Sequence, residues 1–243
     1  MPCEDSASRC SFNSETVVLC QFTLDLPAMI AFSRVGSHWL NCVIELYFDR
    51  PVASGEDISF LDEGRSDWLA FKVHDSRWEC PVHPNVLYLY REPVGTIWSN
   101  IMYAAFRAFG RYPVPTPTSP VNYWCWRYRK HLERYLLDPV YAARTTIRYE
   151  GLQQSPVTEF RKVARHFGAV PDDDRARWAF GQSSRKAMFA IPSKNAAALN
   201  PAMLWPGYAR ARQCFSVAVG AAIRDAVITP ALAPFFEPLD PEA

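Results

Sequence analysis

Short apolar runs alternate along the chain with stripes of helical period. Residues 29–33 form an apolar run that leads into a turn at residues 34–37. Beyond the turn, apolar residues recur at helical spacing from Trp39 to Tyr47. The run is typical of a buried strand and the stripe of an amphipathic helix. The pattern therefore predicts a strand, a turn and a helix, in this order.

Two further strands are predicted at residues 68–73 and 86–90. The second is apolar at successive positions, as expected of a strand that is buried on both faces. Pro93 is typical of the first turn of a helix, and an apolar stripe continues beyond it. The proline-rich run 113–120 is predicted to be a loop, long enough to form a lid or one wall of a substrate site.

Residues 121–137 predict a helix that carries a cluster of basic side chains. We interpret this cluster as a solvated helix face rather than a ligand-binding patch. Its members are Arg127, Arg129, Lys130 and Arg134.

The second half of the chain continues the alternation. A fourth strand is predicted at residues 145–149. Ser155 is suited to cap the start of the next helix and Gly168 to end it. The acidic run 172–174 favours another helix start, because negative charge interacts favourably with that end of the helix dipole. This order of elements predicts an α/β fold, a three-layer sandwich around a central, mainly parallel sheet.

Length and charge narrow the class of protein. The 243 residues suit a single domain over residues 1–243, with a polar and loosely ordered leader at 1–16. Apolar residues make up 49% and charged residues 21%, the balance of a globular protein. A net charge of +1 does not favour nucleic acid or an anionic membrane as a partner, so any anion site must be local. The sequence leaves open whether the protein forms a homo-oligomer.

The cysteines are scattered and include no Cys-x-x-Cys pair. An odd count without metal-site spacing favours reduced thiols in a cytoplasmic protein and no metal site. The N-terminus lacks a basic region followed by an apolar run, and the most apolar stretch, 214–223, is too short for a transmembrane segment. The cysteines stand at positions 3, 10, 20, 42, 80, 125 and 214.

The first candidate site is the predicted turn after the first strand. Gly36 allows the backbone to turn sharply and to approach a ligand closely. The free N–H groups at the start of the following helix favour an anion. Ser37 adds a hydroxyl donor and Arg34 a positive charge. The turn lacks the Lys-Ser/Thr pair of an ATP-type P-loop, which argues against a kinase.

The second candidate site follows the buried strand 86–90. Arg91 lies where that strand ends, and Ser99 falls in the second turn of the next helix. Ligands of parallel α/β sheets bind at the carboxyl ends of strands, and an arginine with a hydroxyl there suits a phosphate monoester. The alternative is an Arg91 paired with Glu92 and a Ser99 that faces solvent.

With both segments in view, the chain resembles the nucleotide-dependent sulfotransferase family. Residues 33–40 are similar to its 5′-phosphosulfate loop, and Arg91 with Ser99 to its 3′-phosphate motif. Residues 72–74 resemble the Lys-Thr-His segment, and residues 148–152 the Arg-Tyr-Glu-Asp-Leu element. The four elements occur in the family's order and extend over more than half of the chain.

The resemblance implies an enzyme of P-loop-like nucleotide-binding topology. It implies transfer of a sulfuryl group from 3′-phosphoadenosine-5′-phosphosulfate (PAPS) to an acceptor hydroxyl or amine, without a metal. His74 matches the general base, and Arg34 matches the residue at the oxygen that bridges phosphate and sulfate. The implied donor-binding residues are Arg34, Gly36, Ser37, His38, Trp39, Arg91, Ser99 and Tyr149.

The chain also departs from the family pattern. Ser33 replaces the usual proline, which we expect to soften the loop, and Gly95 stands where aspartate is frequent. The segment that closes on the 3′-phosphate is not recognisable after residue 180. Its basic substitute is one of Arg185, Lys186, Lys194, Arg210 and Arg212.

Several alternatives stay open. His38, inside the anion loop, rivals His74 as the base, and Asp75 is a candidate to orient the imidazole. The many aromatic residues favour a small-molecule or lipid-like acceptor over a polyanionic glycan. The rival functions are a P-loop kinase and a non-catalytic nucleotide-binding relative.

Overall fold

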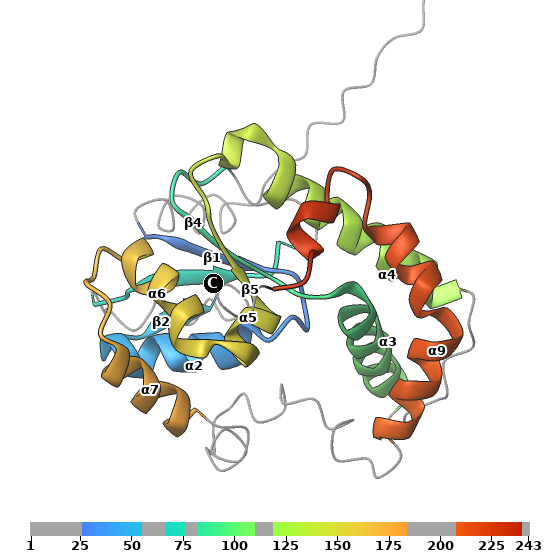
Figure 1. Ribbon diagram of the computed structural model, residues 1–243, viewed down its shortest axis with the longest axis horizontal. Helices are drawn as coiled ribbons and strands as arrows, with labels where there is room; N and C mark the ends of the chain where they lie inside the picture. Colours follow the sequence, from blue (N-terminus) through green and yellow to red (C-terminus); the bar gives the residue numbers. More distant parts are fainter. Residues whose placement is uncertain (1–25, 55–66, 76–81, 110–118, 184–207, 240–243) are drawn as a thin grey trace, which may run out of the picture.

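A five-stranded parallel sheet lies at the centre of the protein (Figure 1). The computed structural model describes residues 26–54, 67–75, 82–109, 119–183 and 208–239. The order of the strands across the sheet is β2-β3-β1-β4-β5, and every pair of neighbours is parallel. The strands are β1 (Ala28–Ala31), β2 (Val52–Ser54), β3 (Ala70–Val73), β4 (Val86–Tyr90) and β5 (Thr145–Arg148).

The apolar runs form the middle of this sheet. Every residue of β1 and of β4 is buried. Met29 on β1 lies opposite Lys72 on one side and Leu87 on the other. Burial on both faces explains why these strands are apolar at successive positions, as the sequence predicted for residues 86–90.

Helices cover both faces and complete the three layers. Figure 1 shows α2, α5, α6 and α7 gathered on one side of the sheet, and α3, α4 and α9 on the other. The helices are α2 (Ser37–Phe48), α3 (Pro93–Phe109), α4 (Ser119–Leu132), α5 (Tyr149–Gln154), α6 (Pro156–His166), α7 (Asp173–Gln182) and α9 (Tyr208–Val227). Single-turn elements are the π-helix η2 (Glu133–Leu137) and the 3₁₀ helices η3 (Pro139–Tyr141) and η6 (Ala233–Phe236). The α/β sandwich predicted from the sequence is confirmed.

Some boundaries differ from the prediction. Tyr149 was predicted to end a strand, but it begins α5, so its side chain stands just beyond the sheet edge. Ser119 was predicted to be in a loop but begins α4. The proline that follows it fits in the first turn, because the N–H groups of that turn have no partner within the helix and proline lacks this group. Ser155 precedes α6 as predicted, although its side chain makes no capping hydrogen bond.

Other expectations concern parts of the chain outside the described residues. These are the leader at 1–16, most of the proline-rich loop and the candidate closing residues Arg185, Lys186 and Lys194. Among the described helices, none combines the length and the hydropathy needed to cross a membrane.

Candidate functional site

The predicted site residues meet at the carboxyl edge of the sheet. The turn before Gly36 follows β1, His74 follows β3, Arg91 follows β4 and Tyr149 follows β5. Because all these strands are parallel, the residues after them emerge at the same edge, where open α/β sheets bind ligands. Four segments far apart in the sequence therefore form one candidate site.

The turn after β1 has a left-handed backbone at two positions. Gly36 has φ 101° and is the N-cap of α2, and Arg34 has φ 67°. No side chain caps the first turn of α2, so its N–H groups form a start suited to an anion. The Arg34 guanidinium lies 4.8 Å from the ring centre of Tyr103 on α3. Ser37 is buried at the helix start.

Tyr149 packs directly against this turn. A Cβ added to Gly36 would lie 2.5 Å from Cε2 of the Tyr149 ring, so only glycine fits there. The same ring lies 5.9 Å from that of Trp39. The Arg91 guanidinium lies over it, 4.3 Å from the ring centre. One aromatic side chain thus links both candidate anion segments.

Arg91 is held at the junction of the two segments. Its Nη1 donates to the Arg34 carbonyl oxygen at 3.4 Å. Its own backbone is bracketed by the Tyr128 hydroxyl, which accepts from the Arg91 N–H at 3.0 Å and donates to the Arg91 carbonyl. The Glu92 carboxylate accepts from the Gly95 N–H and pairs with Arg224, rather than with Arg91.

Ser99 lies inside the protein, two turns along α3 from the site edge. Its exposed fraction is 8%, so it does not face bulk solvent as in the alternative interpretation. Gly95 lies one turn before it on the same helix face.

His74 has a defined tautomer. Its Nδ1 lies 2.9 Å from the Ala31 carbonyl oxygen, and because that oxygen can only accept, Nδ1 carries the proton. The neutral ring then has its lone pair on Nε2, the form that can accept a proton.

His38 differs from His74 in its electrostatic surroundings. The two rings lie 6.4 Å apart. Burial, followed by the charges of Lys72, His74 and Arg34, lowers the pKa of His38 to about 3. An imidazole with so low a pKa is a weak base at neutral pH.

Asp75 is anchored by the helix that covers this end of the sheet. It is buried, and its carboxylate accepts a hydrogen bond from the Tyr135 hydroxyl. Arg134 Nε lies 3.6 Å from the same oxygen. The backbone at Asp75 has φ 25°, in the left-handed region. These contacts fix the position of the strand end that carries His74.

Two buried polar residues of the site were not assigned a role from the sequence. Asn100 donates to the carbonyl oxygens of Ser33 and Thr96 at 2.9 Å each, and it accepts from the Ser33 hydroxyl. These bonds restrain the loop that the sequence predicted to be softer. Lys72 on β3 is buried near His38, and its charge is one cause of the low pKa of that histidine. In the sequence, each of the two is a polar residue within an apolar stripe, and this pattern could have identified both.

The solved structure of mouse sulfotransferase SULT7A1 complexed with PAP matches this chain with a TM-score of 0.50 and 19% sequence identity. The match covers 73% of this chain and 72% of the mouse chain. The two chains share a fold. No protein-family model matches the sequence, and no curated protein does.

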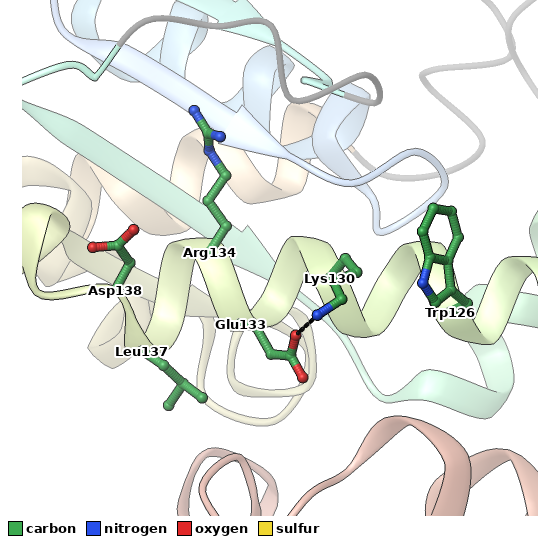
Figure 2. Close-up of a pocket in the computed structure, with 6 residues that line it drawn as sticks. All are labelled: Trp126, Lys130, Glu133, Arg134, Leu137 and Asp138. Atoms are coloured by element: carbon green, nitrogen blue, oxygen red, sulfur yellow. Dashed lines mark hydrogen bonds and ion pairs between the residues drawn. The ribbon is translucent and has the colours of Figure 1, made fainter. Parts of the chain in front are cut away.

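A pocket of about 570 Å³ lies along α4 and η2 of this fold (Figure 2). Figure 2 shows Trp126 and Arg134 projecting in one direction, and Glu133 and Leu137 in the other. The remaining lining residues are Lys130 and Asp138. Because Arg134 contacts Asp75, the pocket wall adjoins the strand end that carries His74.

Each member of the basic cluster on α4 and η2 has a partner close by. Arg129 and Lys130 both pair with Glu133, and Arg127 lies over the ring of Tyr123. Arg127 and Arg129 thus fit the predicted solvated helix face, whereas Lys130 and Arg134 also line the pocket. Within the described ranges, no group of three or more His, Cys, Asp or Glu side chains is arranged to hold a metal ion.

Proposed function

We propose that this protein is a sulfotransferase that uses PAPS as its donor. The observation that carries the proposal is the position of Arg91, bonded to the Arg34 carbonyl and stacked on Tyr149. This arrangement joins the two segments that resemble the donor-binding motifs of sulfotransferases. The shared fold with a sulfotransferase whose structure holds PAP supports the same assignment.

The residues present fit such a donor. The uncapped first turn of α2 would hold the 5′-phosphosulfate, with Ser37, His38 and Trp39 at the helix start. Arg91 and Ser99 would hold the 3′-phosphate, and Tyr149 would lie close to the adenine. No described carboxylate forms an ion pair with Arg91, so its charge stays available to an anion.

His74 is the proposed general base. When bound, the donor supplies a sulfuryl group, whose bond to the phosphate oxygen breaks as a bond to the acceptor oxygen or nitrogen forms. His74 Nε2 would take the acceptor proton, because its Nδ1 proton is committed to Ala31. Arg34 and the start of α2 would stabilise the negative charge that develops on the leaving phosphate.

The acceptor is proposed to be a small or lipid-like molecule with an apolar body. Trp126 and Leu137 give the pocket next to Arg134 an apolar part that suits such a molecule. We place the activity in the cytoplasm, since the scattered cysteines suit a reducing compartment.

Calorimetric titration with adenosine 3′,5′-bisphosphate (PAP) tests the donor site. We expect binding by the wild type and a loss of at least about tenfold in affinity for Arg91→Ala and for Ser99→Ala, since each removes a bond to a charged group. A folded wild type that does not bind would overturn the proposal.

Transfer from PAPS to a panel of phenols and alcohols tests the chemistry. We expect His74→Ala to bind PAP like the wild type but to transfer about 10²–10⁴ times more slowly. Binding of PAP without transfer to any acceptor would instead favour the non-catalytic relative. Transfer that survives in His74→Ala would exclude His74 as the base.

A further inference from the structure

The side of α4 and η2 that faces away from the core exposes large apolar side chains. Tyr123 is 50% exposed, Trp126 45% and Leu137 37%. They lie at helical spacing opposite the buried stripe that contains Tyr128 and Leu132. In Figure 2, Trp126 stands at one end of this row and Leu137 near the other. Single exposed apolar residues are ordinary on a protein surface, whereas several along one face mark an interaction site. We call this side the outer face, formed by Tyr123, Trp126, Arg127, Lys130 and Leu137.

The outer face is basic where it is most aromatic. α4 contains Arg127, Arg129 and Lys130 and no acidic residue. The first acid after it, Glu133, pairs with both Arg129 and Lys130, so one carboxylate meets two cations. The next acid, Asp138, lies beyond the end of η2. A local positive excess therefore accompanies the exposed aromatic rings, although the whole chain carries a net charge of only +1.

This combination of side chains suits a lipid surface. Tryptophan and tyrosine collect at the level of lipid headgroups, because each has a large apolar ring and one polar group. Arginine and lysine lay their apolar stems beside such rings and hold their charges at the level of the phosphates, where anionic lipids attract them. A second copy of the chain fits less well, because a two-fold interface on this face would place its basic residues against the same residues of the other copy.

The pocket beside α4 shares side chains with the outer face. Trp126, Lys130 and Leu137 belong to both, and the volume of this pocket is about 570 Å³. Arg134, on the pocket wall, lies 3.6 Å from the Asp75 carboxylate, which is next to His74 in the chain. A lipid surface against the outer face would therefore border the pocket directly.

We propose that the outer face docks on an anionic lipid surface. Tyr123 and Trp126 enter the headgroup layer, and Arg127 and Lys130 contact the lipid phosphates. Because binding strength scales with the buried apolar area and with the attraction to anionic lipids, a single helix face gives a weak and reversible contact. Docking itself does not depend on the donor site, whereas the entry of a lipid-like acceptor into the pocket from this surface rests on the proposed function.

The aromatic part of the proposal is tested by co-sedimentation with vesicles. The vesicles consist of phosphatidylcholine with or without phosphatidylserine, and no nucleotide is present. We expect the wild type to bind the anionic vesicles more tightly, and Trp126→Ser to bind them about tenfold less tightly than the wild type. The matched control is Trp178→Ser, since Trp178 is 51% exposed and lies on α7, on the other side of the sheet (Figure 1). It should bind like the wild type.

The basic part of the proposal has a control that matches almost completely. Lys130 and Lys162 are 49% and 50% exposed, and each pairs with a glutamate three residues away in its helix. Lys162 lies on α6, on the other side of the sheet. We expect Lys130→Gln to weaken binding to the anionic vesicles about fivefold and to leave binding to phosphatidylcholine vesicles unchanged. Lys162→Gln should bind both kinds of vesicle like the wild type.

Several outcomes would overturn the inference. A wild type that does not bind anionic vesicles excludes docking, and equal losses in Trp126→Ser and Trp178→Ser exclude the outer face as the site. Dimers of the wild type that Trp126→Ser dissociates, without vesicle binding, would assign this face to a second copy. The titration with PAP is carried out without lipid, so a failure of docking and a failure of the proposed function are distinguishable.

Discussion

Gly36 meets two separate requirements at one residue. Its φ of 101° is a conformation that side chains disfavour, and its missing Cβ makes room for the ring of Tyr149. The first requirement comes from the turn and the second from a residue that follows another strand. Substitution at this position should therefore affect both the backbone and the packing of the candidate site.

Gly36→Ala is expected to lower the free energy of unfolding by about 2–4 kcal/mol, because it combines backbone strain with a collision at Tyr149. Gly168→Ala is the matched control, since Gly168 has φ 75° but nothing within 4 Å of its Cβ position. The control should cost only about 1 kcal/mol. Urea unfolding of both variants measures the difference, and equal losses would show that the contact with Tyr149 carries no cost.

The residues that line the turn were predictable because they depend on local chemistry. Arg34, Gly36 and Arg91 follow strands, and the end of a strand can be read from an apolar run. Arg212 and Asn100 could not be placed in this way. The approach of Arg212 to Gly95 depends on how α9 packs on α3, and the contacts of Asn100 on how α3 packs on the turn after β1, so both join parts that are distant in the sequence.

At the scale of elements, η2 connects the helical layer to the end of β3. Tyr135 donates to the buried carboxylate of Asp75, and Arg134 lies 3.6 Å from the same oxygen. Burial raises the pKa of Tyr135 well above its usual value, so the hydroxyl stays a donor throughout the accessible pH range. The π-helical turn places both partners next to one strand end.

Tyr135→Phe should lower the free energy of unfolding by about 1–3 kcal/mol, because it leaves a buried carboxylate with fewer partners. Tyr123→Phe removes the same oxygen from a side chain that is 50% exposed, and it should cost less than about 0.5 kcal/mol. Chemical unfolding compares the two. A Tyr135→Phe variant as stable as Tyr123→Phe would show that Asp75 does not need the Tyr135 hydroxyl.

Elements were predicted well where one period dominates the sequence. β4 is apolar throughout, and α6 has one buried stripe that includes Phe160 and Val163. The sequence did not indicate β2, since three residues are too few to establish a period. Tyr149 was misassigned because β5 passes into α5 without an intervening turn.

At the scale of the whole molecule, three histidines resist protonation. Burial is the largest cause in each case, and it lowers the pKa of His38 and of His131 to about 3 and that of His166 to about 4. Unfolded histidine titrates near pH 6.5. Between these values the unfolded chain binds more protons than the folded one, so stability falls as the pH drops below 6.5. Burial raises the pKa of Glu45, and this one carboxyl group opposes the trend.

The free energy of unfolding is therefore expected to decrease steadily from pH 7 to pH 5, by up to about 1.4 kcal/mol per histidine and pH unit. Urea titrations at several pH values measure the slope. His166→Gln should reduce the slope of the free energy of unfolding against pH by the contribution of roughly one proton, because the variant lacks that titrating group. A stability that is constant between pH 7 and pH 5 would contradict these pKa values.

The position of β1 has a consequence for synthesis. β1 lies between β3 and β4, and both partners come later in the chain, from Ala70 and from Val86. Ribosomes add about 5–20 residues per second, so the apolar segment Ala28–Ala31 is made several seconds before either neighbouring strand. An unpaired apolar strand is a surface that chaperones recognise and that favours aggregation. Slower translation between residues 32 and 85 is therefore expected to reduce the yield of folded protein more than slower translation after β4.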